Sequence, residues 1–130
     1  MLCFSISIKA QNPQCQWAEK IAGTDDDNTY SIISDANGNV YIAGFFESTT
    51  LTFNNGITLS NSGGSNDAYF AKYNSSGECQ WAQKIAGIND DCAYSISADA
   101  YGNVYVAGVF VSDILTFNNE ITLSNSGYSD

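Results

Sequence analysis

The sequence repeats itself with a period of 64 residues. Residues 15–23 and 79–87 share the pattern Cys-Gln-Trp-Ala-x-Lys-Ile-Ala-Gly, and at the same offset residues 35–44 align with residues 99–108. No gap is needed, and about 36 of the 52 aligned positions are identical. A fixed period with this degree of self-similarity is typical of repeat architectures. The repeat therefore limits the possible folds more than any local motif does, and only about two units fit the chain.

Each unit consists of short apolar runs separated by turn residues. Asn-Gly at 37–38 and Asn-Asn-Gly at 54–56 supply the positive φ angles that tight hairpins require. Residues 15–22 alternate with the period of a strand, and residues 40–46 are apolar on both faces, as in a strand packed between two sheets. We therefore predict an all-β chain in which Trp17 and Trp81 occupy equivalent, largely buried positions. The strands expected in one antiparallel sheet, followed by half of another, are residues 30–35, 40–46, 68–73 and 79–86.

A four-stranded unit with an additional hairpin fits a β-propeller blade. The segments at residues 67–77, 81–85 and 99–108 resemble the SBBP repeat, the seven-bladed β-propeller repeat of bacterial secreted proteins. The resemblance covers nearly the whole chain after Gln11. It implies inner strands at 94–99 and 104–110, and an extracellular or cell-surface location. Members of that family usually hold several blades, whereas this chain holds about two, so it is expected to be a fragment of a larger propeller.

The first residues have two interpretations, and both stay open. Residues 1–10 resemble the end of a signal peptide whose basic start is missing. Phe4, Ile6 and Ile8 also alternate with polar residues, as in a half-buried edge strand. The remaining sequence is divided into an outer half-blade with its loop, a complete repeat, and a partial repeat that forms an inner half-blade. These divisions are residues 11–28, 29–92 and 93–130.

Composition excludes several classes of function. The chain has a net charge of −10, with four lysines, no arginine and no histidine. Such a surface repels phosphate backbones, so nucleic-acid binding is not expected. No apolar run reaches the roughly 18 residues of a membrane-spanning helix. Without histidine the chain lacks the commonest general base and transition-metal ligand, and no cofactor is predicted.

Acidic clusters are the weak candidates for a metal site. They comprise Asp25, Asp26 and Asp27 in one unit, and Asp90 and Asp91 in the other. Oxygen ligands around a glycine are typical of calcium loops, and residues 35–39 share this composition, but no glutamate follows at the required spacing. Solvated loops and a hairpin turn are therefore the preferred interpretation.

Two further kinds of site were weighed. Paired carboxylates can perform glycoside hydrolysis, but only when two of them face each other across a cleft. The exposed aromatic residues Tyr101 and Tyr128, beside Asn and Asp, are candidates for a sugar-stacking platform. Most aromatic residues of the chain, however, fall at strand positions that pack sheets together.

The four cysteines allow three complete pairings. Cys15 and Cys79 occupy the same place in successive units, and Cys3 and Cys15 begin antiparallel strands at opposite ends. Cys79 and Cys92 are likewise separated by a whole strand. No pair is expected to meet the distance limit of about 7 Å between Cα atoms. We predict free thiols that behave as small apolar residues.

The sequence thus predicts an extracellular β-propeller repeat module with a structural or a ligand- or protein-binding role, and not an enzyme. One alternative is a carbohydrate-binding, lectin-like propeller that assembles from short chains. A second is a fragment of a propeller-type glycoside hydrolase. Expected partners are further blades of a parent chain or further copies of this chain, and a protein or polysaccharide. Because two blades expose apolar faces and a strand edge, the 130-residue chain alone is expected to be oligomeric or poorly soluble.

Overall fold

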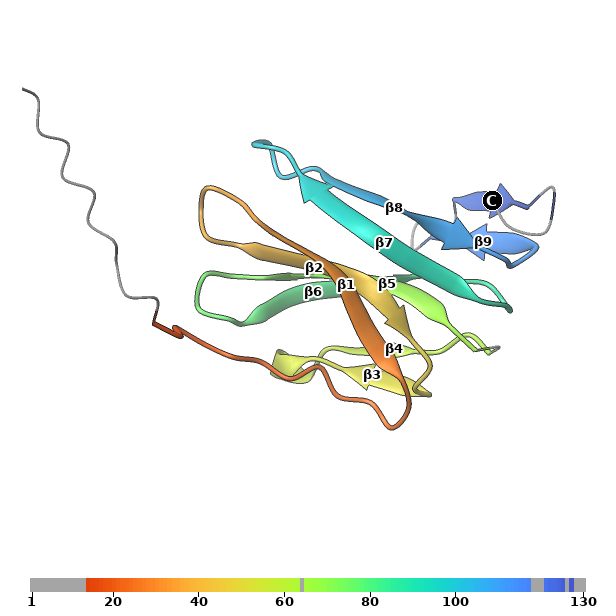
Figure 1. Cartoon of the computed structure of the whole chain (residues 1–130), viewed down its shortest axis with the longest axis horizontal. Helices are drawn as coiled ribbons and strands as arrows, with labels where there is room; N and C mark the ends of the chain where they lie inside the picture. Colours follow the sequence, from red (N-terminus) through yellow and green to blue (C-terminus); the bar gives the residue numbers. More distant parts are fainter. Residues whose placement is uncertain (1–13, 64, 118–120, 126, 128–130) are drawn as a thin grey trace, which may run out of the picture.

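A computed structural model describes residues 14–63, 65–117, 121–125 and 127. In this part of the chain, every regular element is a β-strand except a 3-10 turn at Asn54–Gly56 (Figure 1). The all-β prediction is therefore confirmed. The strands are β1 Asp27–Ser34, β2 Val40–Phe46, β3 Thr50–Thr52, β4 Thr58–Ser60, β5 Asp67–Tyr73, β6 Cys79–Ile85, β7 Asp91–Ala98, β8 Val104–Phe110, β9 Ile114–Thr116 and β10 Thr122–Ser124.

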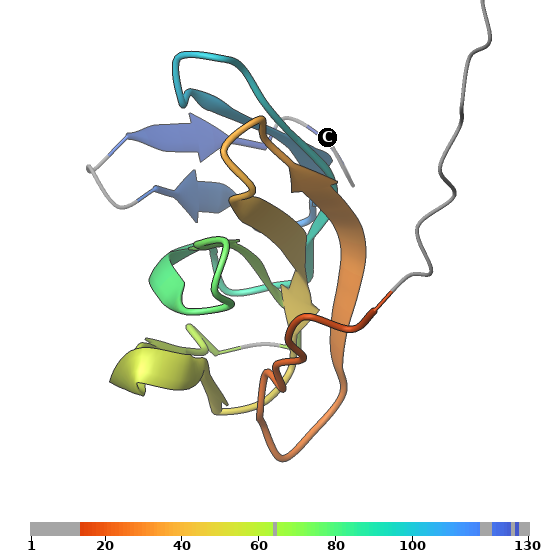
Figure 2. The same ribbon diagram turned by 90° about the vertical axis from the view of Figure 1, so that its left-hand side faces the viewer.

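The central element is a four-stranded antiparallel sheet in the order β1-β2-β5-β6. Its strands are the four predicted from the sequence, and β7 and β8 form half of the next sheet, as expected. The β3–β4 hairpin leaves the sheet between β2 and β5, and β9–β10 does the same after β8. In two perpendicular views, β7 and β8 lie on one side of the four-stranded sheet and β3–β4 lies on the other (Figure 1, Figure 2).

Strand β2 is buried on both faces, as its apolar sequence predicts. Ile42 and Phe46 point into a first apolar cluster, which also contains Leu51 and Phe53 of the β3–β4 region. Tyr41 belongs to a second apolar cluster on the opposite face, together with residues of β7, β8 and β9. The four-stranded sheet is thus held between two apolar layers.

The 64-residue period is also a structural period. Asp27 pairs with Phe46 in the first unit, and Asp91 pairs with Phe110 in the second. Isolated bridges recur as well: Ala22 pairs with Thr52, and Ala86 pairs with Thr116. The additional hairpin of each unit is therefore held by a bridge to a residue that precedes the first strand of that unit, Ala22 or Ala86.

The two Asn-Gly hairpin turns differ. At residues 54–56 both Asn55 and Gly56 have a positive φ, as predicted, whereas the turn at 35–39 differs in part from the prediction. In the turn at 35–39, the Asn39 carbonyl accepts from the Asp35 backbone N–H, and only Gly38 has a positive φ, 78°. Asn37 was expected to share that conformation but does not. The Asp35 side chain holds the turn instead, because one carboxylate oxygen accepts hydrogen bonds from the backbone N–H groups of Asn37 and Asn39. This local side-chain bonding is typical of Asp at the start of a turn.

The predicted outer strand at residues 15–22 is seen only in part. Within the described part of this segment only Ala22 forms a bridge, and its predicted strand partner, residues 4–9, lies outside the described residues. Trp17 and Trp81 are both partly buried, at equivalent positions against the first and the second apolar cluster. They pack on aromatic side chains, Trp17 on Tyr73 and Trp81 on Phe70, with ring centroids 6.1 and 5.7 Å apart.

The described sheets do not close into a ring, so the propeller arrangement remains a prediction. Among the described residues, no helix is long and apolar enough to cross a membrane.

Gly44 provides a test of the packing between β1 and β2. It faces Thr29, beside a bulge that leaves Tyr30 unpaired, and a Cβ at Gly44 would collide with the backbone carbonyl of Asn28. Because this obstacle is backbone, we expect Gly44→Ala to lower the free energy of unfolding by about 3 kcal/mol in urea titrations. Gly127→Ala is the control, since its Cβ would meet open space. Equal unfolding midpoints for the two variants would contradict the bulge geometry.

Candidate functional site

One carboxylate of each acidic cluster, Asp27 or Asp91, belongs to a structural clamp. In the first unit the Ser48 hydroxyl donates to Asp27, with an O–O distance of 2.7 Å. The Ser48 oxygen also accepts hydrogen bonds from the backbone N–H groups of Thr24 and Asp25, at 2.8 and 3.0 Å. Ser48 is fully buried, and its hydroxyl links Thr24, Asp25 and Asp27 of the acidic loop.

The second unit repeats this clamp. The Ser112 hydroxyl donates to Asp91 at 2.8 Å, and the backbone N–H of Gly87 donates to the same carboxylate at 2.8 Å. Asp25, Asp26 and Asp90 are exposed. No group of three or more acidic or cysteine side chains with metal-binding geometry occurs within the described ranges. The five acidic candidates are therefore not brought together as a ligand set.

The turn at residues 35–39 is likewise satisfied internally. Asp35 accepts hydrogen bonds from the Asn39 side chain and from the Tyr41 hydroxyl, at 2.7 and 3.2 Å. The Asn39 side chain is the main cause that lowers the pKa of Asp35 below its ordinary value. Asp99 makes the same contacts in the second unit, and its pKa is lowered in the same way by Asn103.

The aromatic candidates are not gathered by the fold. Tyr101 is exposed at the tip of a turn, and Tyr128 lies outside the described residues. The fold brings together a different pair, Tyr30 and Tyr94, which the sequence pattern does not indicate; their ring centroids are 5.4 Å apart. Both are the unpaired residues of bulges, in β1 and β7. A glycine at the same place in each partner strand, Gly44 or Gly108, is the signal that could have revealed these bulges.

The described cysteines are free thiols in different environments. Cys15 is exposed, Cys92 is half-buried and Cys79 is buried in the first apolar cluster. Burial raises the pKa of the Cys79 and Cys92 thiols above the ordinary value. Cys3 lies outside the described residues.

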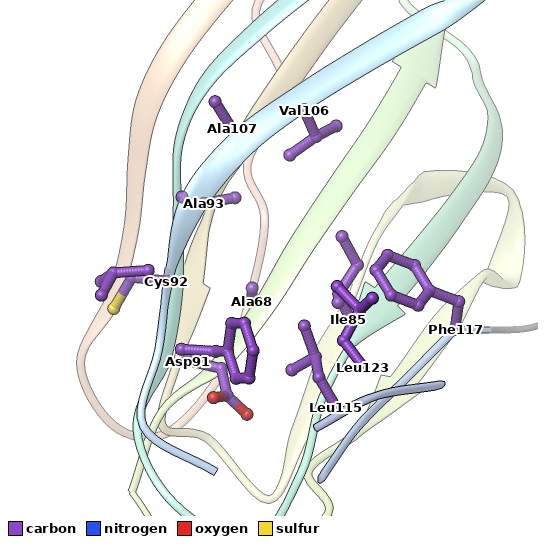
Figure 3. Close-up of a pocket in the computed structure, with 13 residues that line it drawn as sticks. Ala68, Ile85, Asp91, Cys92, Ala93, Val106, Ala107, Leu115, Phe117 and Leu123 are labelled. Carbon is purple, nitrogen blue, oxygen red and sulfur yellow. The ribbon is translucent and has the colours of Figure 1, made fainter. Parts of the chain in front are cut away.

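The most prominent surface feature is the free edge of β8. Strand β2 is paired on both sides, by β1 and β5, whereas its counterpart β8 is paired only with β7 among the described strands. An apolar groove of about 350 Å³ runs beside that edge. Figure 3 shows Ile85, Leu115 and Leu123 meeting there, with Phe117 beside them.

Equivalent residues of the two units differ in side-chain exposure, which shows what the surface beside β8 lacks. Tyr41 and Tyr105 are equivalent residues of β2 and β8, yet Tyr41 is 1% exposed and Tyr105 is 58% exposed. Leu59 packs against the first apolar cluster, whereas its counterpart Leu123 is 47% exposed. Similar side chains therefore lie in a finished core in one unit and at an open surface in the other. Exposed apolar surface of this kind marks interaction sites.

Asp67, at the start of β5, is a buried carboxylate with one satisfied oxygen. The Ser62 backbone N–H donates to it at 2.6 Å, and the Lys84 ammonium lies 3.6 Å away. Its other oxygen has no hydrogen-bond partner in the described part of the chain. Burial raises the pKa of Asp67, and Ser62 and Lys84 offset this effect only in part.

Ser48→Ala tests the clamp between Ser48 and Asp27. The substitution removes three hydrogen bonds, so we expect the free energy of unfolding to fall by about 2 kcal/mol in urea titrations. Ser60→Ala, at an exposed strand position, is the control. If Asp25 to Asp27 instead held calcium, millimolar calcium would raise the melting temperature of the wild-type chain, and the clamp interpretation would be wrong.

A second substitution is Asp67→Asn. A raised carboxyl pKa favours the folded state below the ordinary value of about 4, and that contribution is lost as the pH rises through the folded pKa. We therefore expect Asp67→Asn to be more stable than wild type at pH 7, with the difference disappearing towards pH 4. Chemical unfolding between pH 4 and 8 measures this, and the exposed Asp113→Asn is the control. Lower stability of Asp67→Asn at pH 7 would show that the attraction to Lys84 outweighs burial.

Comparison with known proteins identifies no family for this chain. No protein-family model matches the sequence, and no curated protein matches it. The resemblance of residues 67–77, 81–85 and 99–108 to the SBBP repeat therefore stays a prediction. Function has to be argued from the open edge of β8.

Proposed function

We propose that the chain is a secreted β-propeller repeat module with a structural and protein-binding role, which accepts a further β-sheet unit at the edge and outer face of β8. The observation that carries this proposal is the contrast between Tyr41, 1% exposed, and its equivalent Tyr105, 58% exposed. The secreted location rests on the resemblance to the SBBP repeat.

The arrangement of the sheets supports the propeller interpretation. Antiparallel sheets of four strands pack face to face in a propeller. Here β7 packs against β1 and β2 of the four-stranded sheet through the second apolar cluster. The contact is specific, because the backbone N–H of Ile96 donates to the Ser31 hydroxyl at 3.2 Å. A third sheet could be added to β7–β8 in the same way.

Energetics decide what kind of partner is needed. Tyr105 and Leu123 are each about half exposed, so covering one of them contributes about 1 kcal/mol. Two such contributions do not offset an association cost of about 4 kcal/mol or more. A partner must add backbone hydrogen bonds to the β8 edge and an apolar face of its own. A sheet unit meets both requirements, whereas a single short strand does not.

A non-catalytic role is part of the proposal. The sequence has no histidine, and the carboxylates of Asp27 and Asp91 are occupied by serine and backbone donors. No cofactor is invoked, because the groove beside β8 is lined mainly by apolar side chains.

A peptide of residues 67–86, which spans β5 and β6, tests the proposal. It reproduces the element that covers β2, and it carries two acids and two lysines, so it is not repelled by charge. We expect the labelled peptide to bind the whole chain in fluorescence anisotropy titrations. A peptide of residues 67–73 alone should bind more weakly, because it lacks the second strand.

Leu123→Asp supplies the matched variant. Because a charge would be placed in the groove without disturbing a buried residue, we expect it to weaken binding at least about tenfold, or about 1.4 kcal/mol. Ile88→Asp makes the same charge change at an exposed position outside that groove and should bind as wild type does. No binding of the 67–86 peptide, or equal binding by both variants, would refute the proposed function.

A further inference from the structure

The two ends of the described structure expose complementary faces. Ile96 of β7 packs on the four-stranded sheet and is 4% exposed, whereas its equivalent in β1, Ile32, is 70% exposed. At the other end, Ala107 of β8 is exposed, although its equivalent Ala43 is fully buried. The chain thus carries two copies of each face of its internal sheet–sheet contact. One copy of each face is packed inside the chain, and the other copy is exposed.

The internal contact shows how the free faces fit together. Within the chain, Tyr30 packs on Tyr94, and the Ser31 hydroxyl accepts a hydrogen bond from the backbone of Ile96. If the same contact is repeated 64 residues further along, Tyr94 and Ser95 take the places of Tyr30 and Ser31. The residues that take the places of Tyr94 and Ile96 are then Tyr30 and Ile32, and both are exposed at the opposite end of the described structure.

These two faces cannot meet within one chain. The free face of β1 lies on the side of the first apolar cluster, where Ile32 borders a hollow with Trp17 and Ile21. The β7–β8 sheet lies on the side of the second apolar cluster. The four-stranded sheet separates them (Figure 2).

We propose that a second copy of this chain packs head to tail on the β7–β8 sheet, with its β1 face covering Tyr105 and Ala107. Tyr94 of one copy then stacks on Tyr30 of the next, which repeats the internal tyrosine contact. This inference rests on the proposed function, because it names the sheet unit that β8 accepts. A contact between two different faces leaves one free face at each end of the dimer, so assembly continues into a ring or an open filament.

The dependence of this association on salt follows from the charge of the chain and from the apolar character of the contact. Each copy carries a net charge of −10, so the copies repel one another over distances comparable with the Debye length. The proposed interface itself consists of apolar and tyrosine side chains. Association should therefore strengthen as salt screens the repulsion.

Two variants that block opposite faces provide the test. Ile32→Asp spoils the β1 face, and Ala107→Asp spoils the β8 face; both residues are exposed, so the fold should persist, which circular dichroism checks. By light scattering coupled to size exclusion, we expect wild type to associate and each variant alone to be monomeric at the same concentration. Ile88→Asp, exposed and with the same charge change, should associate as wild type does.

Mixing the two variants distinguishes a head-to-tail contact from a symmetric one. Each variant keeps one intact face, so an equimolar mixture should form a dimer of twice the 14.0 kDa chain mass and nothing larger. Monomeric wild type, unchanged association of either variant, or a mixture that stays monomeric would overturn the inference. Binding of the 67–86 peptide by wild type and by Ile32→Asp, whose substitution lies outside the groove beside β8, would then show that the proposed function survives without self-assembly.

Discussion

Packing of apolar side chains on both faces of β2 is the constraint on which the rest of the structure depends. Ile42 and Phe46 face one apolar cluster and Tyr41 faces the other. A strand buried on both faces can exist only between two layers. For β2, one layer is the β3–β4 region of its own unit and the other comes from β7, β8 and β9 of the next unit. The repeat thus specifies a stack of sheets, and stability is shared between neighbouring units as in other repeat proteins.

The polar residues of the chain serve this stack. Asp27 with Ser48, and Asp91 with Ser112, tie the start of each unit to the loop after its second strand. Asp35 and Asp99 close the turns between these strands. The carboxylates that resemble metal ligands in the sequence are thus used to fix loops at the ends of a packed sheet. Asp67 and Asp91 are buried, whereas the other described acidic side chains are exposed or half-buried.

Much of this fold could be predicted from the sequence, and the exceptions have physical causes. The strands around Tyr41 and Phe70 follow from apolar periodicity and from the Gly turns, which are local signals. Tyr30 was not recognised as a bulge residue, because a bulge depends on its partner strand and leaves only Gly44 as a trace. The aromatic partners of Trp17 and Trp81 could not be predicted, because the equivalence of two residues does not show which ring each one packs on. The open edge of β8 could be predicted, but the groove beside it depends on how β9 and β10 pack.

If every unit of a repeat had the same surroundings, equivalent residues would be equally exposed, and comparing them would not indicate a binding surface. Here Tyr41 and Tyr105 have the same identity and the same turn contacts with Asp35 and Asp99, but opposite exposure. The difference cannot come from the side chains or from their local backbone. It comes from β5 and β6 of the same sheet and from the layer of β7, β8 and β9, which pack on Tyr41 and have no counterpart beside Tyr105 among the described residues. Comparing equivalent residues therefore separates what folding needs from what is left for binding, and it points to the β8 face.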